Sequence, residues 1–195
     1  MITMFRDLLT AIRTTLVLWV LTAILYPVLI LVIGQGIFPF QANGSLIKNP
    51  QGEIVGSALI GQNFTSNRYF ISRPSSVDYS PVKDGLATGI SGGSNLAPSN
   101  PDLLKKVTER IDQLQSNNII PTADLVYSSG SGLDPHISIK AAKAQIQRVA
   151  NARSLNPNQV EILVNKNTEN RFLGIFGEPG VNVLKLNLDL DNLSN

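Results

Sequence analysis

An uncharged apolar run near the N-terminus limits what this chain can fold into more than any other feature. From Leu16 to Ile33 the sequence reads LVLWVLTAILYPVLILVI, eighteen residues without a charged side chain. At about 1.5 Å per residue, a helix of this length covers most of a hydrocarbon core of about 30 Å. A cleaved secretory signal is the alternative, with Gly34-Gln35-Gly36 as a weak cleavage site, but its apolar region would be shorter. The run therefore predicts one transmembrane helix over residues 16–33.

The charges around this run predict its orientation. Arg6 and Arg13 precede it, and no charged residue follows until Lys48. Because basic residues beside a span favour the cytoplasmic side, we expect the N-terminus inside the cell. The predicted fold class is a single N-terminal transmembrane helix plus one mixed α/β extracytoplasmic domain. Residues 1–15 are then a cytoplasmic stub, and residues 34–195 are the soluble domain.

Pro27 lies inside the predicted span, directly after Tyr26. A proline removes one backbone hydrogen bond, which a bilayer cannot replace with water. A neighbouring helix or a local rearrangement must therefore compensate. A kink that packs against a partner helix would make Tyr26 and Pro27 candidate contacts with a membrane partner. The alternative is a proline without a special role, since proline is commoner in membrane helices than in soluble ones.

The composition of the remaining residues excludes several classes of protein. After the span, 14 Lys and Arg face 13 Asp and Glu, so no excess of basic residues points to a nucleic-acid partner. The chain has no cysteine and one histidine, His136, which excludes thiolate sites and every motif that needs two histidines. It also has no Gly-Lys pair, and therefore no phosphate-binding P-loop lysine. We expect no metal site and no intrinsic cofactor.

Local patterns predict both strands and helices in the soluble part. Four segments read as strands: residues 54–60, 68–72, 124–127 and 181–188, the last with Asn182, Leu184, Leu186 and Leu188 on one face. Three helices are predicted from capping residues and apolar spacing: one opened by Asn100-Pro101, one from Ser138 to about Arg153, and a short one from Asn156-Pro157. Two turns are predicted from dipeptides: Asn43-Gly44 and Asn49-Pro50.

Residues 75–101 form a long loop rich in glycine, serine, asparagine and proline. Within it, Gly89-Ile90-Ser91-Gly92-Gly93 matches the pattern of a serine nucleophile elbow, but the required strand before it and helix after it are missing. Residues 90–94 also resemble the Leu-Ser-Gly-Gly-Gln signature of transport ATPases, where backbone N–H groups can meet phosphate. The candidate contacts with a nucleotide or a partner are therefore Ser91, Gly92, Gly93, Ser94 and Asn95.

His136 follows Asp134 by two residues, and this spacing suggests a base with an orienting carboxylate. The alternative function is therefore a membrane-tethered extracytoplasmic serine hydrolase that uses Ser91 or Ser131 with His136. Pro135 between the two residues instead predicts a local turn in which the histidine caps or hydrogen-bonds the backbone. We expect no catalytic residue in this chain.

Many short motifs follow one another along nearly the whole chain: Tyr26-Pro27, Phe38-Pro39, residues 41–47 (QANGSLI), residues 56–64 (GSALIGQNF), Arg73-Pro74-Ser75, residues 91–96 (SGGSNL), Ser99-Asn100-Pro101, residues 131–137 (SGLDPHI), Arg148-Val149-Ala150 and Val181-Asn182-Val183. In these motifs the chain resembles the KdpC family, the small subunit of the bacterial high-affinity potassium-transporting ATPase. It departs from the family pattern at Ile71, where an aromatic residue is frequent, and at Gly180, where arginine often stands.

This resemblance implies an accessory, non-enzymatic subunit of a Kdp complex in the bacterial inner membrane. The implied partners are a channel-like potassium-binding subunit, a P-type ATPase subunit that is phosphorylated, and a small hydrophobic subunit. The motifs also suggest a set of candidate contacts at a domain interface: Gln41, Asn43, Gly44, Gln62, Asn63, Asp134 and His136.

The resemblance further implies a role in assembly and as a catalytic chaperone that raises the ATP affinity of the pump subunit. ATP enters as a cofactor only through this resemblance, together with the pump subunit. A domain outside the cell cannot touch cytoplasmic ATP. Either the topology predicted from Arg6 and Arg13 is wrong or the effect on ATP is allosteric, and we favour the predicted topology.

Overall fold

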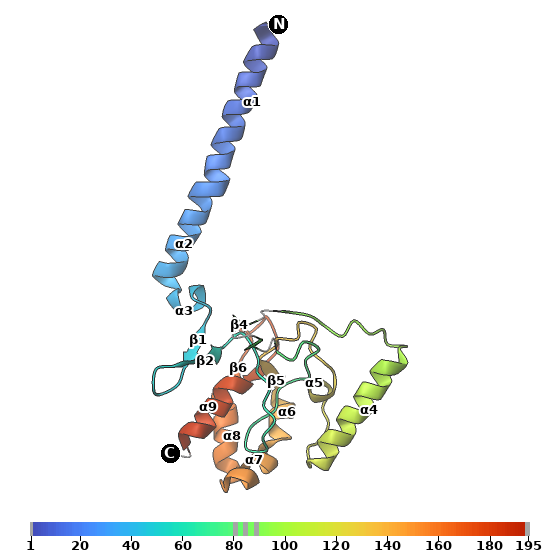
Figure 1. The fold of residues 1–195 in the computed structure, drawn as a ribbon. Helices are drawn as coiled ribbons and strands as arrows, with labels where there is room; N and C mark the ends of the chain where they lie inside the picture. Colours follow the sequence, from blue (N-terminus) through green and yellow to red (C-terminus); the bar gives the residue numbers. More distant parts are fainter. Residues whose placement is uncertain (1, 80–81, 84–85, 88–89, 194–195) are drawn as a thin grey trace. The chain divides into compact units, whose positions relative to one another are not determined.

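The computed structural model describes residues 2–79, 82–83, 86–87 and 90–193. Parts of the loop predicted over residues 75–101 lie outside the described residues, including Gly89 of the elbow-like pattern. The chain divides into two compact units, Met1–Leu46 and Ile47–Asn195 (Figure 1). Each unit is described by itself below.

One long helix makes up most of the first unit. It consists of α1 (Ile2–Val20), a π-helical segment η1 (Leu21–Leu25) and α2 (Tyr26–Ile37). Its stretch Thr3–Ile37 is long and apolar enough to cross a membrane, as judged by length and composition, although a signal sequence passes the same test. The helix includes the predicted span of residues 16–33 and continues beyond it at both ends.

The π-helical segment lies directly before Pro27. The Tyr26 N–H donates to the Leu21 carbonyl, five residues back instead of four. Because Pro27 has no N–H, the regular ladder of hydrogen bonds is interrupted here, and a π turn is one way for a helix to absorb the interruption. The sequence predicted a local rearrangement around Pro27, and the structure contains one. Contact with a partner at this point stays a prediction.

Two short elements follow the long helix. Helix α3 (Pro39–Ala42) ends in a turn at Asn43-Gly44, where Gly44 adopts a φ of +84°. Strand β1 (Leu46–Lys48) pairs with β2 (Ile54–Ser57), and the Asn49 side chain closes the turn between them by accepting the Glu53 N–H at 2.8 Å. Both predicted turns are confirmed. The predicted strand over residues 54–60 ends earlier than expected, at Ser57.

The second unit is a mixed helix and strand domain, as predicted. After β2 its described elements are β3 (Val82–Lys83), β4 (Leu86–Ala87), α4 (Pro101–Ser116), α5 (Ala123–Val126), β5 (His136–Ser138), α6 (Ile139–Lys143), α7 (Ile146–Arg153), α8 (Pro157–Lys166), β6 (Thr168–Glu169), β7 (Gly180–Asn182) and α9 (Val183–Leu193). Strands β5, β7 and β6 form an antiparallel sheet in that order, in which Val181 lies opposite both Ile137 and Thr168.

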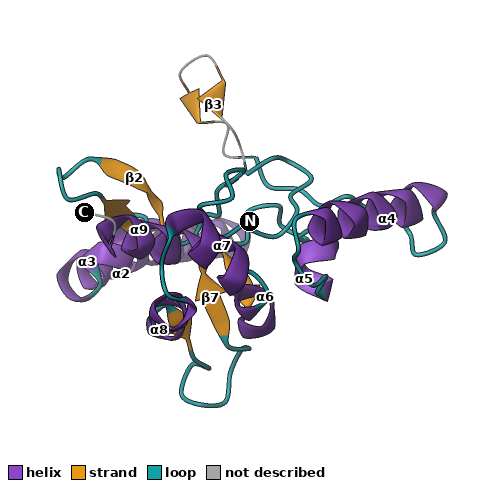
Figure 2. Ribbon diagram, turned by 90° about the horizontal axis from the view of Figure 1, so that it is seen from below, coloured by secondary structure: helices purple, strands orange, loops and turns teal. Residues whose placement is uncertain are grey.

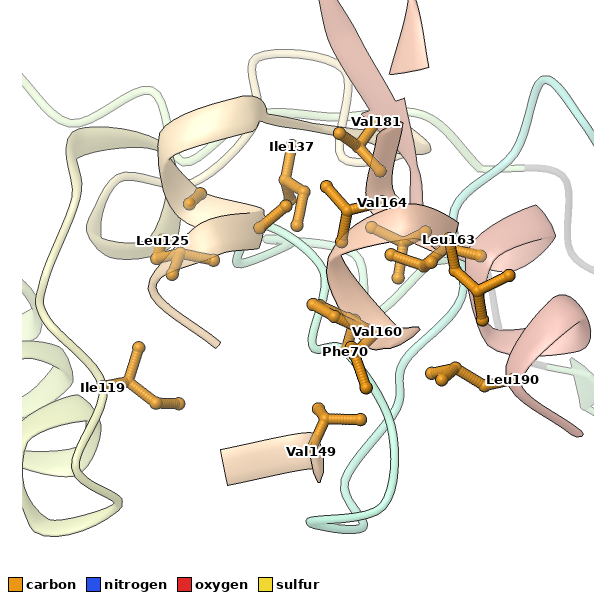
Figure 3. Close-up of a cluster of buried hydrophobic side chains, with 14 of the residues drawn as sticks. Phe70, Ile119, Leu125, Ile137, Val149, Val160, Leu163, Val164, Val181 and Leu190 are labelled. Atoms are coloured by element: carbon orange, nitrogen blue, oxygen red, sulfur yellow. The ribbon is translucent and has the colours of Figure 1, made fainter. Parts of the chain in front are cut away.

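The hydrophobic core lies between this small sheet and the C-terminal helices. Helix α8 packs against α7 and α9, and the three helices lie side by side in Figure 1. Figure 3 shows the buried cluster, which includes Phe70, Ile137, Val149, Val160, Val164, Val181 and Leu190. A large apolar side chain that is removed from water contributes about 1.5–3 kcal/mol, so this cluster is the main source of the unit's stability.

The predicted helix starts are confirmed by their capping bonds. Asn100 accepts the Asp102 N–H at 2.9 Å before α4, and Ser138 accepts the Ala141 N–H at 3.0 Å before α6. A capping box at Asn156 opens α8. The continuous helix predicted from Ser138 to Arg153 is wrong, because the chain forms two helices, α6 and α7, with a break between Lys143 and Ile146.

The strand predicted over residues 68–72 is also wrong. Arg68 lies in a turn, in which the Tyr69 N–H donates to the Ser66 carbonyl at 3.1 Å. Among the described residues no strand pairs with residues 70–72, and side chains bond their backbone instead. Asn187 accepts the Phe70 N–H at 2.8 Å and donates to the Phe70 carbonyl at 3.0 Å. Gln145 accepts the Ile71 N–H at 2.8 Å, and Arg148 donates to the Tyr69 carbonyl at 2.8 Å. Buried amide side chains thus satisfy the backbone of this segment.

Two further strand predictions are corrected to helices. Residues 124–127 largely form the single turn α5, in which the Tyr127 N–H donates to the Ala123 carbonyl at 2.8 Å. Residues 181–188 were expected as one strand, but only Val181 and Asn182 belong to β7, and α9 begins at Val183. The buried residues of α9 include Val183, Leu186, Asn187 and Leu190, which follow helical spacing.

Candidate functional site

The predicted contact loop, residues 91–95, lies against a second loop, residues 129–133. The Gly92 N–H and the Ser91 hydroxyl both donate to the Ser131 carbonyl oxygen, at 2.8 Å each. Two donors on consecutive residues therefore share one acceptor on the neighbouring loop. This arrangement holds residues 91–92 as an ordered turn.

A third segment, which begins at Pro74, joins these two loops. The Ser75 hydroxyl donates to the Gly132 carbonyl at 2.7 Å, and the Ser129 N–H donates to the Pro74 carbonyl at 2.9 Å. The three segments, residues 74–79, 91–95 and 129–133, are called the loop cluster below. They are far apart in sequence and are connected mainly through backbone groups.

Close backbone contacts explain why glycines occur in the loop cluster. A Cβ atom on Gly93 would lie 2.9 Å from the Gly130 carbonyl oxygen, and one on Gly132 would lie 2.6 Å from the Gly92 carbonyl oxygen. Gly132 also has a φ of +69°, which favours glycine. These glycines are therefore required by packing alone, without reference to a ligand.

Two of the hydrogen-bond donors that a phosphate cradle could use already donate to another loop of the protein. Such a cradle presents several backbone N–H groups to the anion, whereas the Gly92 N–H and the Ser91 hydroxyl are directed at Ser131. Ser94 lines a cleft of about 260 Å³ together with three charged residues of α4, the cations Lys106 and Arg110 and the anion Glu109. The contact with a nucleotide or a partner stays a prediction, and the hydrogen bonds of Ser91 and Gly92 favour the partner alternative.

A network of ion pairs surrounds the end of the small sheet. Arg73 contacts Asp134 at 2.9 Å, and the Asp134 carboxylate also accepts the His136 N–H at 2.9 Å. On its other side, the His136 ring Nε2 lies 3.0 Å from Glu169, which in turn contacts Lys185 at 2.7 Å. Carboxylates and cations alternate in this network, so that the charges largely neutralise each other.

The pKa values within the network shift in the directions that this alternation demands. The Asp134 carboxylate raises the pKa of His136, Glu169 adds to the increase, and burial opposes it. Burial alone would raise the pKa of Asp134, but hydrogen bonds from His136 and the charge of Arg73 lower it. For Glu169, burial again favours a higher pKa, but the hydrogen bond and the charge of Lys185, with His136, outweigh it, and the pKa is lowered. The network thus favours a protonated His136 between two carboxylates.

The geometry does not assemble the nucleophile and base of a serine hydrolase. The imidazole of His136 faces carboxylates through both ring nitrogens, with Nδ1 3.7 Å from Asp134 and Nε2 3.0 Å from Glu169. Ser91 donates its hydroxyl proton to a backbone carbonyl. The Ser131 hydroxyl accepts the N–H of residue 133 at 3.1 Å. The imidazole and both serine hydroxyls are thus engaged with other groups, and none of these contacts joins His136 to either serine.

The predicted contact residues of the first unit lie on the long helix and in the turn after α3. Tyr26 and Pro27 lie on the long helix. Gln41, Asn43 and Gly44 form the turn after α3, where the Gly44 N–H donates to the Gln41 carbonyl at 3.1 Å. Asn43 donates to the carbonyl of residue 39 at 2.7 Å, which fixes the turn. Their predicted role at an interface stays a prediction.

The other predicted interface residues lie near the loop cluster. Gln62 donates to a backbone carbonyl of β2 at 2.7 Å, and Asn63 donates to Asp78 at 3.0 Å. Asp134 and His136 belong to the network of ion pairs. All four therefore have structural partners within the unit, and their contact with another protein stays a prediction.

Sequence reasoning missed three members of the network: Arg73, Glu169 and Lys185. Arg73 belongs to an Arg-Pro-Ser motif that the family resemblance uses, so a signal for it existed. Glu169 and Lys185 stand far from His136 in sequence and carry no local pattern. In the part of the chain that the structure describes, no three Asp, Glu, His or Cys side chains are grouped so as to hold a metal ion.

Comparison with protein families gives a match along almost the whole chain. A family model described as "KdpC: K+-transporting ATPase, c chain" matches residues 8–192. The chain belongs to the KdpC family. The resemblance read from the sequence motifs is thereby confirmed.

Curated KdpC proteins from several bacteria agree with this assignment. A protein of Synechocystis sp. named potassium-transporting ATPase KdpC subunit is 61% identical over 189 residues, which cover 97% of this chain and 100% of that protein. KdpC subunit 2 of Nostoc sp. is 60% identical over 186 residues, covering 95% and 94%. The KdpC subunit of Geobacter metallireducens is 46% identical over 192 residues, covering 97% and 99%.

Proposed function

We propose that this protein is the accessory C subunit of an ATP-driven potassium uptake complex in a bacterial plasma membrane. The observation that carries the proposal is the match of the KdpC family model to residues 8–192, which leaves almost no part of the chain outside it. Relatives named as KdpC subunits of potassium-transporting ATPases cover the same length. The proposed partners are the channel-like potassium-binding subunit, the P-type ATPase subunit and the small hydrophobic subunit.

The proposed role is structural and regulatory instead of catalytic. The geometry supports this role because His136 is held between Asp134 and Glu169 and because the Ser91 hydroxyl donates to a backbone carbonyl. No nucleophile and base are thus brought together at the site that the sequence suggested. The protein is expected to help the pump subunits assemble and to change the ATP affinity of the phosphorylated subunit.

The proposed topology places the N-terminus in the cytoplasm and the second unit outside. Arg6 and Arg13 before the span, and no charged residue after it until Lys48, support this orientation. A unit outside the membrane acts on cytoplasmic ATP only through changes in its partners. The effect on ATP affinity is therefore proposed to be allosteric, with a coupling free energy of about 1–3 kcal/mol, or roughly 5- to 150-fold.

The test compares the purified pump subunits with and without this chain. Deletion of its gene is expected to prevent growth at limiting potassium, and a plasmid copy is expected to restore it. In detergent, the complex that lacks this chain should be less stable and should need more ATP for half-maximal hydrolysis. Normal growth of the deletion strain at limiting potassium, with an unchanged ATP requirement, would contradict the proposal.

A further inference from the structure

Strands β6 and β7 are joined by a loop with an unusually apolar tip. Residues 172–176 read Phe-Leu-Gly-Ile-Phe, and their four large side chains are 60–75% exposed. In Figure 2 this loop projects beyond the end of β7. Single exposed apolar residues are common on protein surfaces, but a contiguous apolar group marks a site of interaction. Residues 172–176 are called the apolar tip below.

The apolar tip has a defined conformation. Phe172 and Phe176 form a bridge in which the Phe172 N–H donates to the Phe176 carbonyl at 2.8 Å and the reverse bond measures 3.0 Å. At the base, Arg171 makes two hydrogen bonds to the Glu178 carboxylate, at 2.8 and 2.9 Å. Association would therefore require little further ordering of this loop, which lowers the entropy lost on binding.

Leu173 holds a strained backbone conformation within the apolar tip. Its φ is +53°, and the following Gly174 has a φ of +73°. Two successive residues with positive φ suit a tight hairpin turn, in which Asn or Gly is normally found at the first position. A leucine is disfavoured there by its Cβ, and its side chain is 75% exposed. Local folding thus gains nothing from this side chain, which points to a use outside the chain.

We propose that the apolar tip inserts into an apolar groove on the extracytoplasmic face of a partner subunit of the pump complex. This inference rests on the proposed function, because it takes its partner from the complex. It goes beyond that function because it specifies which part of this chain makes the contact and what kind of surface on the partner binds it. The tip supplies the apolar centre, and the charged groups at its base supply a polar rim.

The charges around the tip favour a protein partner over the lipid surface. Loops and helices that bind anionic bilayers have Lys or Arg residues free to meet lipid headgroups. Here Arg171 is paired with Glu178, and Lys185 is paired with Glu169. A cleft of about 490 Å³ beside the tip is lined by more carboxylates than cationic groups: Asp124, Asp134, Glu169 and Glu178 against Arg73 and His136. An anionic membrane would not be attracted to this region, whereas an apolar groove with a charged border would fit it.

The first experiment uses Leu173→Asn in the full chain, expressed together with the other pump subunits. Asparagine tolerates the left-handed conformation, so this variant removes the apolar side chain and relieves backbone strain at the same time. We expect an unchanged or higher melting temperature and about tenfold or greater loss of co-purification with the partners. Ile162→Asn, which changes an exposed apolar residue of α8, is the matched control and should co-purify normally.

The second experiment places a fluorescent label on the tip. The sequence contains no cysteine, so Leu173→Cys creates a single site for an environment-sensitive dye. In liposomes that hold the full chain alone, the emission should match that of a dye in water, and it should shift to the blue when the partner subunits are included. The same dye on Leu104→Cys, an exposed position of α4, should not respond.

The outcomes separate this inference from the proposed function. If the wild-type chain does not co-purify with the pump subunits, the proposed function fails. If the wild-type chain and Leu173→Asn co-purify equally well, the proposed function stands and the inference about the tip is overturned. A blue shift in liposomes without partners would assign the tip to the lipid surface and would also overturn the inference.

Discussion

Replacing Gly93 with alanine tests whether the loop cluster is a packed structural contact. The added Cβ atom would lie 2.9 Å from the Gly130 carbonyl oxygen, and ordinary contacts begin at about 3.4 Å. The Cβ atom is fixed directly to the backbone of residue 93 and its neighbour is a backbone carbonyl, so the two loops must separate by several tenths of an ångström. Overpacking of this kind costs about 1–3 kcal/mol.

The separation also strains the hydrogen bond next to this contact. The Gly92 N–H donates to the Ser131 carbonyl at 2.8 Å, and such a bond contributes about 0.5–1.5 kcal/mol net. Together the two effects lower the free energy of unfolding by roughly 2–4 kcal/mol. For a domain of this size, about 2–4 °C per kcal/mol gives a melting temperature about 5–15 °C lower.

Thermal unfolding of the full chain in detergent, followed by near-ultraviolet circular dichroism, measures this change. Gly130→Ala is the matched control, because its Cβ atom would meet nothing within 4 Å, and it should melt within a few degrees of the wild type. Equal melting temperatures for Gly93→Ala and the wild type would refute the packing argument. A phosphate cradle would give another result, namely saturable ATP binding to the wild type that Gly93→Ala abolishes without a change in stability.

Three further predictions concern other parts of the chain. Protease added outside spheroplasts should remove the residues beyond Lys48 and leave the N-terminal stub; protection of the domain would reverse the proposed topology. Pro27→Leu should leave insertion intact but weaken co-purification with the pump subunits, and unchanged assembly would mean that Pro27 has no special role. Because its folded-state pKa is raised, His136 should stabilise the protein fully below about pH 6.5 and lose this contribution as the pH rises through the raised pKa. His136→Gln should therefore destabilise the protein more at pH 5.5 than well above that raised pKa, and a difference independent of pH would contradict the assigned charge.

Sequence reasoning succeeded where the deciding interactions are local. The long apolar helix, a candidate membrane span, follows from eighteen uncharged residues in a row. The helix starts at Asn100, Ser138 and Asn156 follow from side chains that bond to the backbone two or three residues on. The loop around Ser91 could be recognised as an unusual segment from its composition. Its contact with Ser131 could not be derived, because forty residues separate the two positions.

Three of the wrong predictions, those for residues 68–72, 138–153 and 181–188, share a physical cause in buried polar side chains. Asn187 interrupts the apolar pattern of α9, and as a result the alternation of leucines over residues 181–188 resembled a strand. In the structure Asn187 lies on the buried face, where it pairs with the backbone of Phe70. Gln145 likewise lies in the break between α6 and α7, where its buried side chain bonds the backbone of Ile71. A hydrophobicity pattern assigns a polar residue to the exposed face, so its burial cannot be predicted until its hydrogen-bond partner is known.

The sequence by itself determined the apolar helix that is long enough to cross a membrane, the helix caps, the turns and the family, since each rests on neighbouring residues or on ordered motifs. Only the tertiary structure decided how residues 68–72 satisfy their backbone, and which groups surround His136. It also brought out the apolar tip, because exposure and the positive φ of Leu173 depend on the folded loop. Contacts between residues distant in sequence form only when the chain folds around its core, and no local sequence pattern predicts them.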